Sequence, residues 1–442
     1  MERRGEEVLF RSIFQPGRRL YVLAGVLLAI VAWAIFAYLH QINKGLGVTG
    51  LNRPVFWGIY LINFVFFIGI SHAGTLVSAI LRITGAEWRR PITRAAEAIT
   101  VFSLVLGVGS IVIDLGRVDR IWTLVRYGRF QSPLLWDVSS VSVYLTASVI
   151  YLYLPLIPDV ARLRDHLADK QEGHSWRQWL YGKLALGWTG TEKQWHRLER
   201  AISIMAVLII PIAVSVHTVV SWIFAMTLQP AWHSTIFGPY FVVGAIFSGI
   251  ATLIVVMALI RKAWGLEGYL TARHFNNLGL LLLTMCLFWF YFTFAEYLTE
   301  FYGAESAPMS VLLAKIGGEF TPAFFGMVFF CFVIPFVILA FPRTRTIAGT
   351  VVASILIDIG MWLERYTIVV PALTRPQLPY RIGVYFPTWV EWSITLGCLA
   401  IFVLFYLVFS RLFPIISVWE VEETEQAPAP AAEEPAAVET AA

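Results

Sequence analysis

The sequence predicts an all-α polytopic membrane protein with about ten transmembrane helices. Hydrophobic residues make up 58% of the 442 residues, only 14% are charged, and the mean hydropathy is +0.70. Water-soluble domains do not show this composition. Apolar runs of about 20 residues, enough to cross a hydrocarbon core of roughly 30 Å, recur along most of the chain. The net charge of only +4 argues against nucleic acid as a partner.

The spans are predicted in chain order from these runs. They cover residues 20–40, 54–82, 92–115, 135–157, 200–223, 236–260, 275–298, 319–341, 347–370 and 388–412. The first 19 residues are charged and lack the short apolar core and cleavage site of a signal peptide, so we expect the first span to be retained. Residues 420–442 are rich in Glu, Ala and Pro, which predicts a disordered acidic tail.

Basic residues predict the orientation of the chain. With both termini on one side, that side carries 23 of the 33 Lys and Arg residues, so the positive-inside rule places both termini in the cytoplasm, with residues 1–19 as a cytoplasmic segment. The inner loop 158–199 is polar with four tryptophans and predicts an amphipathic excursion along the inner surface.

The predicted outer loop 116–135 is an exception to the positive-inside distribution of basic residues. Its sequence, GRVDRIWTLVRYGRFQSPLL, places four arginines among aromatic residues. Such a loop is typical of a surface that binds an anionic or protein partner. A merely solvated loop is the alternative.

Ionisable side chains inside the spans are the candidate functional residues, because charges in lipid are costly. They are His72, Asp114, Asp137, His217, Glu296, Asp358 and Glu364. Asp114 and Asp137 lie at one depth, at the outer ends of consecutive spans. Two carboxyl groups beneath the arginine-rich loop are suited to accept protons from a small donor with an apolar tail. Helix-end capping is the alternative for this pair.

The ionisable residues of the spans other than Asp114 and Asp137 predict a proton path. Protons hop between titratable groups joined by water, and a row of histidines and carboxylates supplies such groups. Counting residues from the predicted span ends places His72 and His217 toward opposite faces, so we expect that they do not share a haem iron. Packing roles for the histidines and a surface role for Glu296 stay open. Glu364 and Arg365 are neighbours in sequence and should point apart, so we expect their partners, and that of Asp358, on other helices.

The sequence predicts no resident redox or metal centre. Cys286, Cys331 and Cys398 each stand alone in an apolar stretch, which excludes a disulfide framework or a cluster held by spaced thiolates. The motifs for nucleotide binding, HExxH zinc sites and paired CxxC sites are missing from the sequence. We therefore expect neither haem nor an iron-sulfur cluster in this chain.

Several stretches, in order, resemble one family of membrane proteins. They are NFVFFIGISHAGTLVSAILR, WRRPITRAAEAITVF, DLGR, SPLLWD, VSVHTVVSW and AWHSTIFGPYFVVGAIFSG. Over residues 45–412 the chain resembles the NrfD/PsrC-type integral membrane subunits, and most closely the C subunits of bacterial alternative complex III, a quinol:electron-acceptor oxidoreductase. The resemblance implies two four-helix bundles, residues 54–223 and 236–370, flanked by the helices 20–40 and 388–412.

The resemblance also implies a role in a bacterial inner (cytoplasmic) membrane. Menaquinol or ubiquinol would bind beneath the 116–135 loop, and electrons would pass to an outer-face iron-sulfur subunit and then to multihaem cytochrome c subunits, beside sister membrane subunits. By motif, the implied quinol pocket consists of Asp137 and Asp114 as catalytic acids, with Trp136, Arg117 and His72 around them. The implied proton path uses His72, His217, Glu296, Asp358 and Glu364.

One residue departs from the resemblance, and two alternative functions stay open. Asp114 stands where the similar C subunits have His, although DLGRP is common at this point in the wider family. The sister F subunit of the same complex has similar bundles without the quinol site, whereas the SPLLWD motif and the arginine-rich loop favour the C subunit. An ion-coupled secondary transporter would show broken helices around a midplane site, whereas the strongest polar group here lies at the outer rim.

Overall fold

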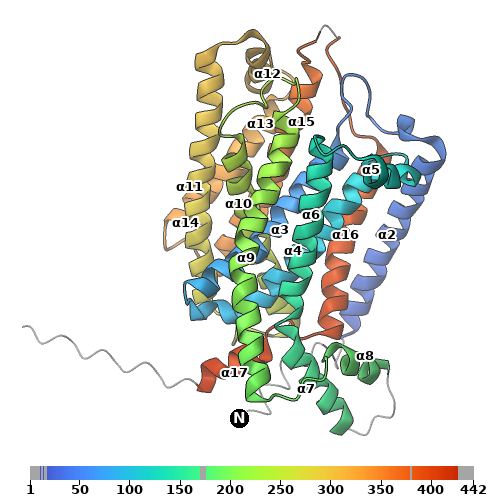
Figure 1. Cartoon of the computed structure of the whole chain (residues 1–442). Coiled ribbons are helices and arrows are strands. Elements are labelled where there is room, and N and C mark those ends of the chain that lie inside the picture. Colours follow the sequence, from blue (N-terminus) through green and yellow to red (C-terminus); the bar gives the residue numbers. More distant parts are fainter. Residues whose placement is uncertain (1–9, 11–12, 14–16, 170–175, 379–380, 427–442) are drawn as a thin grey trace, which may run out of the picture.

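The computed structural model describes residues 10, 13, 17–169, 176–378 and 381–426. These residues form helices and loops without a strand, and ten helical segments are long and apolar enough to cross a membrane (Figure 1). The predicted fold class and number of spans are therefore confirmed. The ten segments are α2 (Arg18–Lys44), α3 (Ile59–Ile83), α4 (Arg90–Asp114), α6 (Pro133–Tyr153), α9 (Glu192–Ala225), α10 (Phe237–Trp264), α11 (Ala272–Gly303), α13 with α14 (Thr321–Val328 and Ile334–Ala340), α15 (Ile347–Thr374) and α16 (Trp389–Leu412).

Local sequence signals set the ends of these helices. Thr191, Thr271 and Thr388 each form a capping box at the start of α9, α11 and α16, which satisfies two otherwise free backbone donors. Because of its cap, α9 begins eight residues before the predicted start of that span at residue 200. At its other end α10 stops at Gly265, which adopts the left-handed conformation (φ 67°) that glycine tolerates at helix ends.

The spans pack as two closed groups of four. In the first, α3, α4, α6 and α9 each contact their neighbours around the ring; in the second, α10, α11, α14 and α15 do the same. The two groups meet where α3 packs against α10 and α15, and α2 pairs with α16 at one side (Figure 1). In the most apolar stretch of α3, 88% of residues are buried, against 17% for α2, so α3 lies between the groups and α2 faces outward.

Close helix contacts depend on glycine at two positions. A Cβ atom on Gly74 of α3 would lie 1.8 Å from the carbonyl oxygen of Ala96 on α4, and one on Gly360 of α15 would lie 2.6 Å from the sulfur of Cys331. Cys331 belongs to a π-helical segment, η4 (Phe329–Val333), which joins α13 to α14. That span therefore carries a wider turn at mid-length, a feature often found near functional sites.

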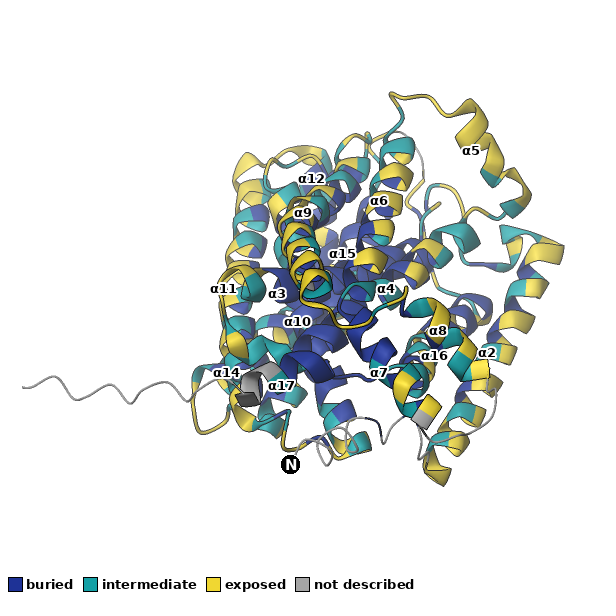
Figure 2. Ribbon diagram, turned by 60° about the horizontal axis from the view of Figure 1, so that its bottom comes forward, coloured by how far each residue is buried: buried dark blue, intermediate teal, exposed yellow. Residues whose placement is uncertain are grey.

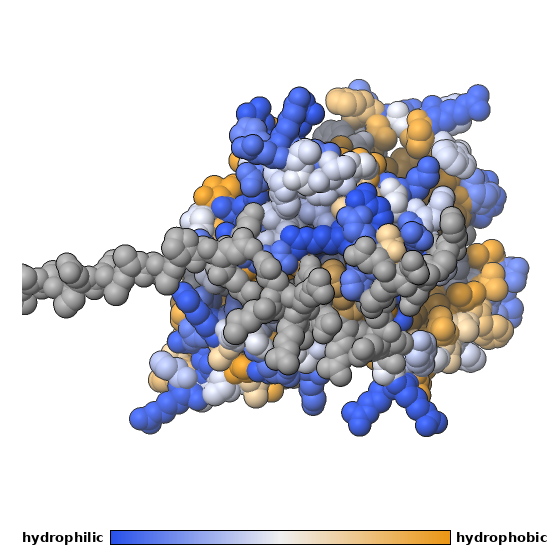
Figure 3. All heavy atoms as spheres, turned by 90° about the horizontal axis from the view of Figure 1, so that it is seen from below, coloured by the Kyte–Doolittle hydropathy of each residue, from blue (hydrophilic) through white to orange (hydrophobic). Residues whose placement is uncertain are grey.

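Short helices cover the two ends of the molecule. One end, called the α17 end here, carries α7 (Leu156–Asp169), α8 (Trp176–Leu184) and α17 (Val418–Gln426). The other, the α5 end, carries η1 (Leu46–Val48), η3 (Val118–Arg120), α5 (Ile121–Tyr127) and α12 (Ser306–Gly317). The helical turn η2 (Glu87–Arg89) precedes α4. Figure 3 views the α17 end, where hydrophilic residues are prominent on the described surface.

The prediction for the C-terminal tail is wrong for its first residues. Residues 420–426 belong to α17, and Glu420 is only 2% exposed because arginines from other helices bind it. Residues 427–442, and most of the predicted N-terminal segment 1–19, lie outside the described residues.

Candidate functional site

Asp137 lies in the first turns of α6, at the α5 end of the first group of helices. Pro133 begins this helix, since its fixed φ suits the first helical position. Asp137 shares the buried face of α6 with Val141, Tyr144, Ser148 and Tyr151, at the spacing of three or four residues that aligns side chains on a helix. It is 7% exposed, and its Oδ1 atom is buried without a hydrogen-bond partner. Such an oxygen is costly and is free to take a proton or a ligand.

Asp114 is the last residue of α4 and approaches a different set of residues. Its Oδ1 atom is also buried without a partner, and its electrostatic neighbours are Glu391 of α16 and Tyr60 of α3. Tyr60 donates its hydroxyl to Gln41 Oε1 at 2.6 Å. Among the described contacts none joins Asp114 to Asp137, so the predicted cooperation of the two carboxyl groups stays a prediction.

Along the sequence, Arg117 precedes α5 and Trp136 follows it. Trp136 donates its indole N–H to the carbonyl oxygen of Phe130 at 2.5 Å, which ties the loop after α5 to α6. Arg117 pairs with Asp119 at 2.9 Å, with side chains 64% and 61% exposed, and its hydrogen bonds lower the pKa of the Asp119 carboxyl. Arg117 thus contacts a loop acid, and its predicted place in the quinol pocket is untested.

The segment around α5 presents large apolar side chains to the outside. Trp122, Tyr127 and Phe130 are 70% to 81% exposed, and α5 stands away from the helix bundle in Figure 2. Exposed apolar residues gathered in this way, beside arginines, are typical of a binding surface. The partner-binding interpretation of loop 116–135 stays a prediction, with the solvated loop as its alternative.

His72 and His217 lie side by side, with ring centroids 4.5 Å apart. The expectation that they lie toward opposite faces is wrong, because hydropathy misplaced the helix ends. α3 begins at Ile59, so His72 is 13 residues from the α5 end of its helix, and α9 runs to Ala225, eight residues after His217. The geometric ground for expecting no shared haem iron, opposite depths in the membrane, therefore does not hold, and the absence of a haem stays a prediction.

The two histidines differ in their hydrogen bonding. His72 places Nδ1 2.8 Å from the carbonyl oxygen of Ile68 and Nε2 2.7 Å from that of Ala213. Carbonyl oxygens only accept, so a neutral imidazole satisfies one of these contacts and an imidazolium satisfies both. Neither ring nitrogen of His217 has a hydrogen-bond partner in the described structure. His72 therefore has a hydrogen-bond acceptor beside each of its two ring nitrogens, so its doubly protonated form would be satisfied. His217 has no such acceptor at either ring nitrogen in the described structure.

Hydroxyl groups continue from His72 toward the α17 end. The Tyr144 ring lies 5.2 Å from that of His72, and its hydroxyl donates to the carbonyl oxygen of Ser71 at 3.0 Å and to Thr75 Oγ1 at 3.1 Å. Thr75 in turn donates to Thr100 of α4 at 3.0 Å. These groups form a chain between α3, α4 and α6 in the core of the first group of helices.

A buried acid follows along the same helices. Ser78 of α3 donates to Glu97 Oε1 at 2.9 Å and lies 3.2 Å from the Tyr151 hydroxyl. Glu97 is 3% exposed, and its Oε2 atom is buried without a partner. Sequence reasoning missed Glu97, although its place inside the predicted span 92–115 is the signal that identifies it.

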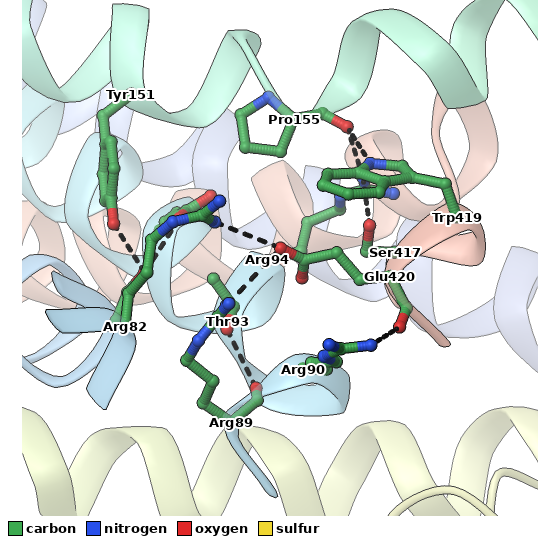
Figure 4. A network of polar contacts seen from close by, with 12 residues as sticks. Arg82, Arg89, Arg90, Thr93, Arg94, Tyr151, Pro155, Ser417, Trp419 and Glu420 are labelled. Atoms are coloured by element: carbon green, nitrogen blue, oxygen red, sulfur yellow. Dashed lines mark hydrogen bonds and ion pairs between the residues drawn. The ribbon is translucent and has the colours of Figure 1, made fainter. Parts of the chain in front are cut away.

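The C-terminal segment is joined to the α17 end by ion pairs and hydrogen bonds (Figure 4). Arg82 and Arg89 bind Glu420 Oε1 at 3.3 and 3.4 Å, and Arg90 donates to the Glu420 carbonyl oxygen at 2.9 Å. On the same end of the molecule, the buried pair Arg94 and Asp159 meets at 2.6 Å. The C-terminal segment is therefore built into the fold of this end.

The second group of helices holds three of the predicted residues. Glu364 accepts a hydrogen bond from the indole of Trp289 on α11 at 2.5 Å, and Asp358 accepts one from Thr252 of α10 at 3.1 Å, as expected for partners on other helices. The prediction that Glu364 and Arg365 point apart is wrong, since the two side chains form an ion pair. Adjacency in sequence therefore does not prevent this contact.

Glu296 is buried near the α5 end of α11. It is 5% exposed, accepts a hydrogen bond from Ser234 and lines a cavity of about 140 Å³ with His233 and Glu300. The surface role left open for Glu296 is therefore not supported. Nearby, burial lowers the pKa of Lys315 on α12, while Glu300 and Glu296 oppose that shift.

The cysteines and acids do not converge on a metal site in the described part of the chain. No group of three or more His, Cys, Asp or Glu side chains there is arranged so that it could hold a metal ion, and the three cysteines are buried free thiols. The groups gathered here, which are carboxyls, imidazoles and hydroxyls, are suited to moving protons.

Sequence comparison identifies the family of this chain. The family described as Polysulphide reductase, NrfD, matches residues 47–377, from η1 through α15. The chain belongs to the NrfD family. This match includes both groups of four helices and leaves out only α2 and α16 of the ten spans, so the NrfD core contains every predicted site residue.

Three proteins of oxidoreductase complexes are similar in sequence to this NrfD chain. A putative membrane subunit of a dimethyl sulfoxide reductase from Halobacterium salinarum is 26% identical over 88% of this chain and 90% of its own length. An Hdr-like menaquinol oxidoreductase integral membrane subunit of Archaeoglobus fulgidus is 24% identical, with 94% and 98% covered. The integral membrane subunit of a menaquinone reductase of Nitratidesulfovibrio vulgaris is 23% identical, with 87% and 88% covered. The relatives are membrane subunits of oxidoreductase complexes.

Proposed function

We propose that this NrfD protein is the quinol-oxidising membrane subunit of an alternative complex III. Oxidation of one quinol to quinone releases two protons and two electrons. Asp137 takes a proton at the α5 end, with Asp114 as the second acid, while Trp136, Arg117 and His72 surround the quinol. The electrons leave for an outer-face iron-sulfur subunit and pass to multihaem cytochrome c subunits. The chain therefore works only as part of a complex.

The single observation that carries this proposal is the Asp137 carboxyl. It is buried, it has an oxygen without a partner, and it stands in the SPLLWD motif. A general base must be within reach of the proton that it accepts and must not be neutralised by a structural cation. The printed names of two relatives, a menaquinol oxidoreductase subunit and a menaquinone reductase subunit, support menaquinol as the substrate, with ubiquinol as the other candidate.

The proposal includes a proton path through both groups of helices. In the first group it uses His72 and His217; in the second it uses Glu364, Asp358 and Glu296. The contact between the two histidine rings and the cavity beside Glu296 support this assignment, since a proton path requires neighbouring titratable groups and access for water.

The proposed location is the bacterial inner membrane, with both termini in the cytoplasm. The α5 end then faces outward, and the exposed aromatic residues of loop 116–135 are available to the iron-sulfur subunit. The excess of basic residues around α7, α8 and the other loops of the α17 end supports this orientation through the positive-inside rule.

Purification of the tagged full-length chain in mild detergent tests this function. We expect iron-sulfur and multihaem cytochrome subunits to co-purify, together with haem absorbance that added menaquinol or ubiquinol reduces. A sister F-type subunit would bring the same partners but would keep its quinol activity after replacement of Asp137. A colourless protein that works alone in liposomes would contradict the proposal and indicate an ion-coupled transporter.

A further inference from the structure

One cation lies in the interior between the two groups of helices. Arg365 of α15 is 3% exposed, and its side chain reaches the surface of α3 in the first group. A Cβ atom on Gly69 of α3 would lie 3.3 Å from Nη2, and one on Gly244 of α10 would lie 3.3 Å from Nη1 and Nη2. Two glycines, one of α3 and one of α10, thus leave room for the guanidinium.

The hydrogen-bonding groups of Arg365 are only partly satisfied. The guanidinium forms its ion pair with Glu364 through Nη1, whereas Nε and Nη2 are buried without hydrogen-bond partners. Arginine keeps its charge in proteins, and a buried charge without compensation is strongly destabilising. Ionised Glu364 is therefore the counter-charge of this guanidinium in the structure.

His217 of α9 is a titratable group of the first group of helices that lies near the same guanidinium. It lies within electrostatic range of both Arg365 and His72 and has no partner on either ring nitrogen. The other titratable groups around the guanidinium are Tyr240 of α10 and Cys331 of η4. Arg365 thus has a carboxylate of its own group as its ion-pair partner and an imidazole of the other group within electrostatic range.

This placement links the charge states of the two residues. When Glu364 is ionised, it balances Arg365, and an imidazolium at His217 is opposed only weakly by the neutral pair. When Glu364 takes a proton, the guanidinium is unbalanced and repels a second positive charge nearby, an interaction that is strong where the dielectric constant is low. Protons on His217 and on Glu364 therefore exclude each other.

We infer that Arg365 is a positioning residue that separates the proton path into two halves, one in each group of helices. A proton that reaches Glu364 must leave before the next one loads His217, so the two halves are not filled together. The inference rests on the proposed proton path and adds to it a residue and an order of occupancy. The reaction is a proton transfer only, and no electron or other bond change takes part.

The first test is an infrared titration of the Glu364 carboxyl, identified as the band that is missing in Glu364→Gln. In the purified complex, Arg365→Met should move its titration midpoint upward by one pH unit or more, about a tenfold change in proton affinity. Arg365→Lys, which keeps the charge, should leave the midpoint near that of the wild type. Arg345→Met is the matched control, because Arg345 binds Asn276 and the Leu339 carbonyl oxygen away from the path. An unchanged midpoint in Arg365→Met overturns the inference.

The second test measures protons moved per electron in vesicles that contain the intact complex. Arg365→Met should keep quinol oxidation and lower the proton yield at least about twofold, whereas Arg365→Lys and Arg345→Met should keep both. If Arg365→Met does not accumulate, Arg365→Gln takes over the test of Arg365 and should show the same loss. The double variant Glu364→Gln with Arg365→Met, a replacement of a whole buried pair that is often tolerated, tests the two-part path itself and should also lose proton yield.

The outcomes separate this inference from the proposed function. A wild-type complex that oxidises quinol without moving protons, or a double variant with the wild-type proton yield, overturns the two-part path and leaves the quinol function standing. A wild-type complex that does not oxidise quinol contradicts the proposed function, while the infrared titration still decides whether Arg365 sets the charge of Glu364.

Discussion

The two ends of the first group of helices contain buried aspartates with opposite surroundings. At the α17 end, Asp159 is fully buried and accepts from the Arg94 guanidinium and from the backbone amides of Val418 and Trp419 at 2.6 to 3.3 Å. At the α5 end, Asp137 is nearly as buried, yet one of its oxygens has no partner. A carboxylate that is saturated with donors is fixed as part of the fold, whereas one that lacks donors is free to exchange a proton.

Two glutamates repeat this contrast. Glu391 accepts from the Tyr385 hydroxyl and from the amides of Gly50 and Thr388 at 2.6 to 2.8 Å. Burial raises the pKa of Tyr385, so its hydroxyl keeps the proton that it donates. Glu97 has one donor and one oxygen without a partner. The donors around a buried acid, more than its burial, therefore separate structural acids from candidate functional ones.

The largest effect on stability is expected for Asp159→Asn. The substitution leaves the Arg94 guanidinium buried without its counter-charge, which typically costs about 3–5 kcal/mol. We expect a lower unfolding temperature in detergent and a C-terminal segment that proteases cleave more readily. Asp165→Asn is the control, since Asp165 is 64% exposed in its pair with Arg164, and exposed pairs are worth about 0–1 kcal/mol. Equal stability of the two variants would remove the contrast between the ends.

A smaller loss is expected for Glu391→Gln. Both carboxylate oxygens of Glu391 accept hydrogen bonds, whereas the glutamine side chain has one oxygen that accepts and an NH2 group that only donates. At least one buried donor therefore loses its partner, at a cost of about 1–3 kcal/mol. Thermal unfolding of the detergent-solubilised chain measures this change, with exposed Glu267→Gln as the control. Wild-type stability in Glu391→Gln would show that the donors around this acid contribute little.

Almost no loss of stability is expected for Glu97→Gln. The substitution keeps the oxygen that accepts from Ser78 and removes a buried ionisable group, a kind of change that is often neutral or stabilising. The same unfolding assay compares it directly with Glu391→Gln. A loss as large as that of Glu391→Gln would mean that Glu97 is a structural acid and would end its place in the hydroxyl chain.

The sequence predicted the spans because their signals are local. Apolar runs long enough to cross a bilayer identified all ten, and the motif SPLLWD placed Asp137 at the start of the right helix. The excursion between residues 158 and 199 contains the short helices α7 and α8, as its polar and aromatic composition indicates. These features depend on a few consecutive residues, and such features are visible in a single sequence.

The remaining features depend on how helices are placed beside one another. The depth of His72 was misjudged because α3 begins at Ile59, five residues after the predicted start of that span at residue 54. The tail from Glu420 was read from composition, which cannot show that Arg82, Arg89 and Arg90 from α3 and its neighbours surround it. The slot that Gly69 and Gly244 provide for Arg365 joins three helices far apart in sequence, and no local pattern contains it.

Quinol-dependent reduction of the haems in the purified complex, compared between wild type and Asp137→Asn, tests the central claim most directly. The amide keeps the shape of the side chain and removes the acid. We expect normal assembly and unfolding temperature with a rate at least about 100-fold lower, the scale of a lost general base. Glu319→Gln, an exposed acid of the same end that pairs with Arg375, should keep the wild-type rate. Normal turnover in Asp137→Asn would contradict the account.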